Sequence, residues 1–256
     1  MTGPAELRTG ELRLLSRISS ASNLVFYGTI GDTPVVYKPT AGEKPLWDFP
    51  DGDLAQREVA AYLVSEAIGW DIVPRTWLRD GPFGEGMVQL WREPDREQHA
   101  VELTAPELAT SAGWCRVFEA IGEPDFPVAI VHEDSAALRR IAVFDVIVNN
   151  ADRKGGHILE MADGHRHGID HGLTFHADDK LRTVLWGWVD SPLRDDELAG
   201  VARVRDELAS ALGRSLTGLL SPFEVEMLEW RCELLLAEGR FPAPQNGWHV
   251  VPWPLF

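Results

Sequence analysis

The chain has 256 residues, of which 45% are hydrophobic and 25% are charged, as is typical of a globular protein with one large domain or two small ones. No apolar run approaches the roughly 18 residues of a membrane span, and the N-terminal sequence MTGPAELRTGELRLL has no basic segment leading into an apolar one. These features exclude a membrane-spanning protein and a secretory signal, and they predict a cytoplasmic protein.

The charge balance narrows the classes of expected partner. The chain has 40 acidic and 24 basic residues, which gives a net charge of −16 with histidine neutral. This charge repels the phosphates of nucleic acids and anionic lipid surfaces. Cys115 and Cys232 lie far apart without a CxxC partner, so they predict neither a disulfide framework nor a thiolate metal site. We therefore expect a small molecule or a protein as partner, and no nucleic acid.

The first elements in the chain are expected to be short antiparallel strands. Residues 11–18, 23–30 and 34–39 are rich in β-branched and aromatic side chains. Gly31-Asp32-Thr33 separates the second run from the third and is typical of a hairpin turn. The chain is therefore predicted to begin as a small antiparallel sheet.

A helix is expected next, over residues 54–68. Asp53 can cap its N-terminus, and Gly69 can end it. Two further strands are expected around residues 73–80 and 86–91, after which a charged stretch with a proline interrupts the pattern. We place the domain boundary near the end of the last strand.

The second half of the chain is expected to be mainly helical. The expected helices are 107–121, 135–148, 195–213 and a helix from the capping box Ser221-Pro222-Phe223-Glu224 to Gly239. Polar loops rich in glycine, histidine and acidic residues fill positions 149–190. Together these elements predict an α+β, bilobal fold with a small antiparallel-sheet lobe in residues 1–90, a mainly helical lobe in residues 91–256, and a ligand cleft between them.

Two polar loops carry the side chains with the most useful chemistry. In the first loop, Asp152 can accept a proton and Lys154 can neutralise a transferring phosphate. His157, together with Asp170 of the second loop, can hold a divalent ion that bridges phosphates. Each residue taken singly also fits a structural role, since an aspartate can cap a turn, Asp-x-Gly can form a tight turn and a lysine can be a solvated surface charge.

The order of these residues along the chain carries a resemblance. The chain has Lys38 on a strand, Glu58 on the next helix, an Asp-x-Lys-x-x-His loop from Asp152, and an Asp-x-Gly turn at Asp170. In this respect it resembles the atypical kinases related to the phosphatidylinositol 3- and 4-kinases and to HipA-type protein kinases, including an actinobacterial group described only as similar to them. Asp152-Arg153-Lys154 matches the start of their catalytic loop, and Asn150 matches an asparagine of the HipA-type loop. The resemblance implies a protein-kinase-like fold for nearly the whole chain.

The resemblance also implies a role for each residue. Lys38, ordered by Glu58, would hold the α- and β-phosphates of ATP. Asp152 would orient or deprotonate the acceptor hydroxyl, and Lys154 would stabilise developing charge. Asp170 would be the metal-binding aspartate of the Asp-Phe-Gly turn, with histidine in place of phenylalanine.

The remaining positions of the ATP site depart from the usual pattern. Ser19, Ser20 and Ser22 stand where a glycine-rich loop is usual, and their hydroxyl and backbone N–H groups would bind phosphate. His157 replaces a metal-binding asparagine, and because imidazole is a softer ligand than an amide oxygen, Mn²⁺ would compete well with Mg²⁺. Gln89 and Leu90 would lie at the hinge against the adenine, although residues 87–91 also fit an ordinary edge strand.

The sequence thus predicts an ATP-dependent phosphotransferase that moves the γ-phosphoryl group to a hydroxyl of a protein or a small molecule. Transfer of AMP is an alternative, because atypical kinase folds can bind ATP in a reversed pose. A pseudokinase that binds nucleotide without transfer is another. A metallohydrolase is a third, with Asp152 and Asp170 joined by five closely spaced histidines. Those histidines are His157, His165, His167, His171 and His176.

Overall fold

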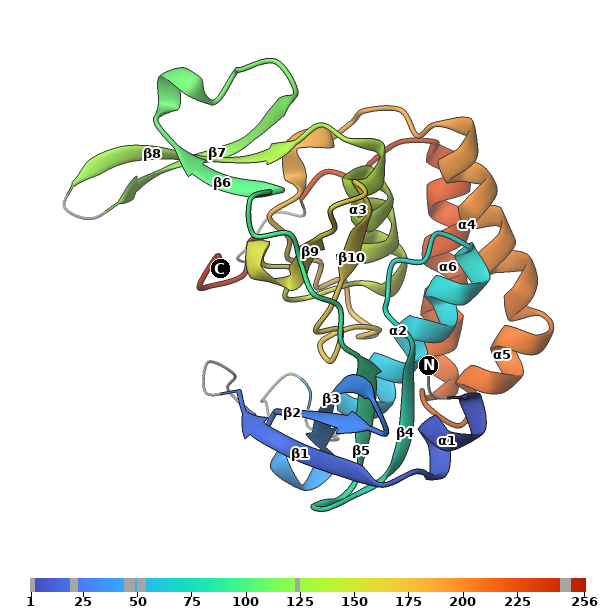
Figure 1. Cartoon of the computed structure of the whole chain (residues 1–256). Helices are drawn as coiled ribbons and strands as arrows, with labels where there is room; N and C mark the ends of the chain where they lie inside the picture. The colour runs from blue at the N-terminus through green and yellow to red at the C-terminus, as the bar shows by residue number, and fades with distance from the viewer. Residues whose placement is uncertain (1–2, 19–22, 44–48, 50–53, 123–124, 245–249) are drawn as a thin grey trace.

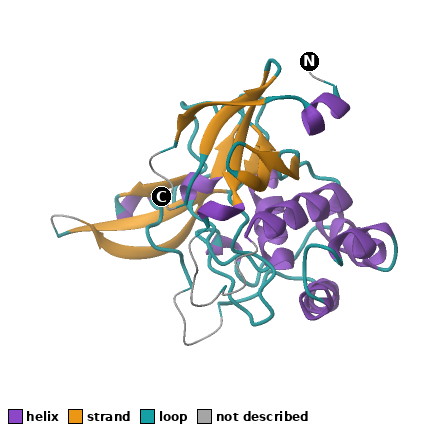
Figure 2. Cartoon of the chain, turned by 90° about the horizontal axis from the view of Figure 1, so that it is seen from below, coloured by secondary structure: helices purple, strands orange, loops and turns teal. Residues whose placement is uncertain are grey.

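The computed structural model describes residues 3–18, 23–43, 49, 54–122, 125–244 and 250–256. It is an α+β fold in which antiparallel sheets and helices occupy different regions, as the sequence predicts (Figure 1). Viewed at right angles to this, the longer helices gather on one side of the molecule and the two larger sheets on the other (Figure 2). In the part of the chain that the structure describes, no helix has the length and apolar character needed to span a membrane.

The N-terminal sheet has five antiparallel strands in the order β1-β2-β3-β5-β4. Its strands are β1 (Leu12–Arg17), β2 (Phe26–Ile30), β3 (Thr33–Pro39), β4 (Thr76–Gly81) and β5 (Gly84–Leu90). The side chains of β3 alternate, so that Val35 and Tyr37 are fully buried while Lys38 points to the other face. The predicted turn joins β2 to β3, and Gly31 takes the positive φ of 55° that such a turn requires.

Helix α2 (Leu54–Ile68) crosses between β3 and β4. It matches the predicted helix and ends before Gly69, whose φ of 76° is favourable only for glycine. The proposed cap Asp53 lies outside the described residues. Val64 and Ile68 are fully buried in the main core together with side chains of α3. This core therefore continues across residue 90, and the division into lobes of residues 1–90 and 91–256 stays a prediction.

A three-stranded sheet replaces the first helix expected in the second half. Its order is β6-β8-β7, formed by β6 (Val101–Thr104), β7 (Trp114–Gly122) and β8 (Phe126–Glu133). The prediction of a helix over 107–121 is wrong. The pairing of β7 with β8 shifts register between Arg116 and Phe118, which breaks the two-residue alternation that would reveal a strand. Apolar residues at 114, 117, 118 and 121 then mimic the spacing of a helix.

The other long helices form where they were predicted, with one break. The remaining helices are α1 (Pro4–Thr9), α3 (Ala136–Val148), α4 (Asp195–Leu208), α5 (Ala211–Leu216) and α6 (Pro222–Glu238). The stretch expected as one helix over 195–213 is thus two helices. The capping box of α6 is confirmed, because the Ser221 side chain accepts from the Glu224 N–H and the Glu224 carboxylate accepts from the Ser221 N–H.

Short elements complete the region that follows α3. Strands β9 (Ile158–Glu160) and β10 (Arg166–Gly168) pair as a small hairpin. The described part of the chain also forms four short 3₁₀ helices, η1 (Thr40–Gly42), η2 (Pro106–Leu108), η3 (Gly155–His157) and η4 (Trp186–Trp188). The polar loops of the sequence analysis therefore flank this hairpin, between α3 and the N-terminal sheet (Figure 1).

Candidate functional site

Two acidic residues from distant parts of the chain contact Lys38. The Nζ atom of Lys38 on β3 lies 2.5 Å from Oε1 of Glu58 on α2 and 2.7 Å from Oδ1 of Asp170. Burial alone would lower the pKa of Lys38, but Asp170 and Glu58 outweigh it and the pKa lies above its usual value. The Lys38 ammonium in turn holds the pKa of Asp170 well below its usual range. Glu58, the predicted partner of Lys38, and Asp170 are therefore both brought to its ammonium.

Asp170 lies at the open end of this cluster. Its side chain is 48% exposed, whereas that of Glu58 is 2% exposed. Asp170 takes a φ of 61°, a left-handed conformation that aspartate tolerates better than most residues. The backbone N–H of the next residue, His171, donates to Oε2 of Glu58 over 2.9 Å. Glu58 thus holds both Lys38 and the Asp-x-Gly turn, and its two oxygens are both in use.

The loop after α3 places the second group of predicted residues. Nζ of Lys154 lies 3.1 Å from Oδ2 of Asp152, with both side chains about one-fifth exposed at 18% and 23%. Burial raises the pKa of Asp152, and the neighbouring Lys154 opposes that shift. A carboxylate with a raised pKa is a stronger base than an ordinary aspartate, as a group that takes a proton from a hydroxyl needs to be.

His157 connects the two groups. Its Nδ1 lies 2.8 Å from the backbone carbonyl oxygen of Asp152, and its Nε2 lies 3.3 Å from Oδ2 of Asp170. The carbonyl can only accept, so Nδ1 carries the proton, and the neutral ring presents the lone pair of Nε2 to a carboxylate oxygen. Burial lowers the pKa of His157, which favours this neutral form. Two acceptors that face each other in this way are the arrangement that a cation between them would satisfy.

The spacing of these two acceptors fits a divalent ion. Two ligands at right angles on an octahedral ion, each about 2.1 Å away, are about 3 Å apart, close to the 3.3 Å observed. The hydrogen bond to Nδ1 orients the ring, as second-shell contacts do for metal-binding histidines. The spacing is therefore compatible with an ion between His157 and Asp170, and the binding of Mg²⁺ or Mn²⁺ there stays a prediction.

A fully buried ion pair that was not predicted from the sequence supports the loop. Arg153 and Asp145 are both 0% exposed, with Nε donating to Oδ2 over 2.8 Å and Nη2 donating to Oδ1 over 2.9 Å. Asp145 also accepts from the Asn150 side chain, whose oxygen accepts from the backbone N–H of Asp152 over 3.0 Å. Asp145 thus sets the position of Asp152 through two neighbours. A signal was present, since Asp145 is the one acid in the apolar run from Ile141 to Val148.

The same arginine also positions the Asp-x-Gly turn. Nη2 of Arg153 lies 2.7 Å from Nε2 of His171, and because a guanidinium can only donate, this imidazole nitrogen accepts. Nη1 of Arg153 donates to the backbone carbonyls of His157 and Ile169. One buried side chain therefore ties the loop of Asp152 to the turn of Asp170.

The positions predicted to contact the rest of the nucleotide are less well defined. Ser19, Ser20 and Ser22 lie outside the described residues. The side chain of Gln89 donates to Thr76 over 2.9 Å, and the backbone N–H of Leu90 donates to the carbonyl of Arg75 over 2.9 Å. These donors have partners within the sheet. Contact of Gln89 and Leu90 with adenine stays a prediction. It would have to use polar groups of these residues other than the Gln89 side-chain N–H and the Leu90 backbone N–H.

The five histidines do not form one metal cluster. His157 contacts Asp170, the ring of His171 contacts Arg153, and Nδ1 of His176 accepts from the backbone N–H of Asp178. The expectation of a joint site with Asp152 and Asp170 is therefore wrong, because chain segments that are close in sequence point these rings toward different partners.

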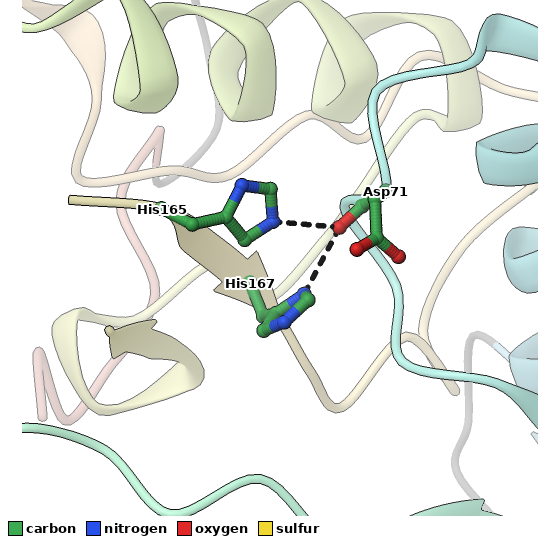
Figure 3. Close-up of side chains that lie close together, drawn as sticks. All are labelled: Asp71, His165 and His167. Atoms are coloured by element: carbon green, nitrogen blue, oxygen red, sulfur yellow. Dashed lines mark hydrogen bonds between the residues drawn. The ribbon is translucent and has the colours of Figure 1, made fainter. Parts of the chain in front are cut away.

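His165 and His167 meet Asp71 at the turn after α2 (Figure 3), with possible ligand atoms within 4.8 Å of one another. Nε2 of His165 lies 2.8 Å, and Nδ1 of His167 lies 2.9 Å, from the backbone carbonyl oxygen of Asp71. Both nitrogens therefore donate to this carbonyl, and the dashed lines in Figure 3 mark these two contacts. In this arrangement the pair fixes a turn.

Comparison with known proteins gives one close relative in sequence. Protein Rv2133c of Mycobacterium tuberculosis (strain ATCC 25618 / H37Rv) is 46% identical over 264 aligned residues, which cover 98% of this chain and 95% of that protein. A crystal structure of the Helicobacter pylori proinflammatory kinase CtkA aligns with a TM-score of 0.44 and 13% identity over 92% of this chain and 94% of that chain. No family model matches the sequence.

Proposed function

The chain belongs to the same family as Protein Rv2133c of Mycobacterium tuberculosis, and we propose that its members are ATP-dependent phosphotransferases of the atypical-kinase type. The single observation that carries this proposal is the contact of Lys38 with both Glu58 and Asp170, at 2.5 and 2.7 Å. Protein kinases place phosphates beside a metal ion with a strand lysine paired to a helix glutamate and with a separate metal-binding aspartate. The resemblance to the phosphatidylinositol 3- and 4-kinases and HipA-type kinases belongs to this proposal.

In the proposed reaction, Lys38 binds phosphate oxygens of ATP and Glu58 keeps its ammonium in place. Asp152 accepts the proton of the acceptor hydroxyl as that oxygen forms a bond to the γ-phosphorus. The bond between the γ-phosphorus and the bridging oxygen breaks, and ADP leaves with those electrons. Lys154, 3.1 Å from Asp152, is placed to stabilise the charge that develops on the transferred group.

His157 and Asp170 are the side chains that would hold the divalent ion. When bound, such an ion neutralises phosphate charge and aligns the phosphate chain. Glu58 fixes Asp170 from behind through the N–H of His171, and the Asp152 carbonyl fixes the ring of His157. The acceptor is proposed to be a hydroxyl of a protein or a small molecule.

Thermal unfolding with nucleotides tests the binding half of the proposal. ATP and ADP are each added with Mg²⁺, with Mn²⁺ and without metal. A ligand present at about 100 times its Kd stabilises the folded state by about 2.7 kcal/mol, which for a chain of this length is roughly 5–10 °C. We expect a metal-dependent shift with ATP that is lost in Asp170→Ala and kept in Asp206→Ala, an exposed aspartate on α4. Equal shifts in the two variants would contradict the assigned site.

Radiolabelled ATP tests the transfer half. With the γ-phosphate labelled, we expect label in an acceptor fraction from a lysate of the source cells or in the protein itself. With the α-phosphate labelled we expect none. Label from the α-phosphate would instead show AMP transfer, and nucleotide binding without transfer of either label would show a pseudokinase. Asp152→Asn should abolish transfer and leave the ATP-induced thermal shift in place, whereas normal turnover by this variant would remove Asp152 from the mechanism.

A further inference from the structure

A pocket of about 450 Å³ borders the segment that follows the Asp-x-Gly turn. One wall is the segment 177–182, the second is α6, and the third comes from residues 242, 243 and 250 near the C-terminus. Its volume is within the range of pockets that hold small organic molecules. None of the residues assigned above to ATP, metal or acceptor lines it, so it is a site separate from the proposed catalytic one.

The pocket has an apolar lining with one unusual charge. Trp186, Trp230, Met227 and Leu234 provide much of its surface. Trp230 is 48% exposed and Leu234 is 38% exposed, which is high for apolar side chains of this size. The indole N–H of Trp186 already donates to the carbonyl of Val250 over 2.7 Å. The pocket therefore offers ring faces and hydrocarbon to a ligand.

Arg231 is the buried charged residue among those that line the pocket. It is 7% exposed, its Nε donates to the backbone carbonyl of Ile147 over 2.8 Å, and its buried Nη2 has no hydrogen-bond partner among the described residues. Burial lowers the pKa of Arg231 to about 10. A buried guanidinium with a donor left over is costly unless an acceptor reaches it. Nη2 is shielded from the pocket as well as from solvent, so an anionic group in the pocket would pair with the guanidinium through the part of Arg231 that lines it.

The other charged groups of the pocket limit the charge of the ligand. Asp178, Asp179 and Glu238 line it from exposed positions at the rim, and the basic Lys180 and Arg182 already interact within the chain. An entering phosphate dianion would be repelled by the acidic rim and would find one buried positive charge. A single carboxylate matches that charge and the planar geometry of a guanidinium.

From this geometry we infer that the pocket binds a small carboxylic acid with an apolar, ring-containing body, the carboxylate paired with Arg231 and the body packed against Trp186 and Trp230. The site is distinct from the proposed ATP site, and its occupation does not depend on phosphotransfer.

The wall of the pocket is bonded to the loop that carries Asp152. The backbone N–H of Arg182 donates to the Asn150 carbonyl over 2.9 Å, and the Arg153 N–H donates to the Arg182 carbonyl over 3.0 Å. The Asn149 side chain donates to the carbonyls of His176 and Asp178 and accepts from the N–H of Lys180. A ligand that packs against 177–182 therefore restrains residues 149–153 as well. Any effect of this restraint on catalysis rests on the proposed function.

Isothermal titration with three probes of equal body size tests the inference. The probes are 2-naphthoate, its neutral carboxamide, and 2-naphthyl phosphate. For the unmodified chain we expect 2-naphthoate to bind at least about tenfold more tightly than either of the others, which is about 1.4 kcal/mol. Arg231→Met should remove the preference of naphthoate over the carboxamide. An unchanged preference in this variant, tighter binding of the phosphate, or no binding of naphthoate at millimolar concentration would overturn the inference.

A second variant keeps the test valid if Arg231→Met fails to fold. Leu234→Trp fills the pocket from an exposed position without touching Arg231's hydrogen bond, so we expect it to fold and to weaken all three probes by about tenfold or more. Phe223→Trp is the matched control, because Phe223 is exposed on the same helix and does not line the pocket. Equal binding by the two variants would also overturn the inference.

Hydrogen exchange distinguishes failure of this site from failure of the proposed function. With naphthoate bound, the N–H groups of Lys180, Arg182 and Arg153 should exchange more slowly than in the free protein, whether or not the protein transfers phosphate. Binding of naphthoate with protection confined to other segments would place it elsewhere and contradict the inference.

Discussion

At the scale of single residues, Glu58 holds two halves of the proposed site with one carboxylate. One oxygen accepts from Lys38 and the other from the backbone N–H of His171. A glutamine in its place has the same shape but carries no charge, and it can offer one oxygen in place of two. The ammonium of Lys38 would then depend on Asp170, which the proposed mechanism assigns to the metal ion.

We expect Glu58→Gln to weaken binding of ATP with Mn²⁺ by about tenfold or more, because a hydrogen bond to a charged group contributes about 1.5–3 kcal/mol. Titration calorimetry at fixed pH measures the change. Glu66→Gln, on the exposed side of the same helix, serves as the control and should bind like the unmodified protein. Unchanged affinity in Glu58→Gln would show that Lys38 needs no partner on α2.

The Arg153–Asp145 pair is the residue-level feature on which the proposed catalytic loop depends. Removing one member of a fully buried pair leaves the other charge without compensation, which costs about 3–5 kcal/mol. We expect Arg153→Met to lower the free energy of unfolding in urea by this amount. Arg205→Met, which removes a surface pair with Asp206, should cost less than about 1 kcal/mol. If the double variant Arg153→Met/Asp145→Leu regains most of the stability lost in Arg153→Met, the cost comes from the unpaired charge. Similar losses of stability in Arg153→Met and Arg205→Met would refute this account.

At the scale of elements, the sheet formed by β6, β8 and β7 is the main departure from the predicted organisation. Strand β8 carries His132, which is fully buried beside η4. Its Nδ1 lies 2.9 Å from the carbonyl of Glu133 and its Nε2 accepts from the N–H of Gly187 over 3.0 Å. Both nitrogens are thus used by a neutral ring. Burial lowers the pKa of His132 to about 4.

This pKa predicts a specific loss of stability in acid. In the unfolded chain, histidine binds a proton near pH 6.5. The contribution of His132 to the free energy of unfolding is therefore fully present above that pH, and it is lost as the pH falls through 6.5 toward the pKa of His132 in the folded state. For this one residue the loss between pH 7 and pH 4 is about 3 kcal/mol. Urea unfolding across this range should therefore show a shallower decline in His132→Asn than in the unmodified chain. Parallel curves for the two proteins would contradict the neutral buried state.

At the scale of the whole molecule, the C-terminal segment returns to the loop that carries the proposed catalytic residues, and Figure 1 shows where the C-terminus lies. The Gly155 N–H donates to the carbonyl of Leu255 over 2.8 Å, and a Cβ atom on Gly155 would come within 2.5 Å of the Phe256 ring. Gly155 lies between Lys154 and His157, so residues 255–256 form one boundary of the proposed site. The glycine is needed here for close approach and not for its backbone angles.

We expect Gly155→Ala to destabilise the protein by about 1 kcal/mol, near the lower end of the range for added volume, because Phe256 is half exposed and its ring can move. Combination with Phe256→Ala should remove most of this cost in thermal unfolding. Hydrogen exchange at the alanine N–H should also be faster than at Gly155. Additive losses in the double variant would show that the ring is not what the new methyl group meets.

The sequence by itself determined the features that depend on interactions between residues close together in the chain. The alternating strands, the glycine turns, the capping box of α6 and the acidic charge all follow from neighbours in the chain, and each is set by interactions over a few residues. The order Lys38, Glu58, Asp152 and Asp170 also followed from the sequence as a set of candidates. Their meeting could be expected only from a resemblance, because nothing local brings Lys38 to within 2.7 Å of Asp170.

Tertiary structure decided which polar groups are buried and which partners they find. From the sequence, Arg153 is indistinguishable from an ordinary charged loop residue. In the folded chain it is buried and connects the loop of Asp152 to the turn of Asp170. Arg231 reads as part of a helix surface, yet packing against α3 leaves its Nη2 without an acceptor. The bulge at Arg116 hides a strand within a helical spacing. In each case the cause is desolvation or pairing by residues distant in sequence, and these are fixed only when the chain has folded.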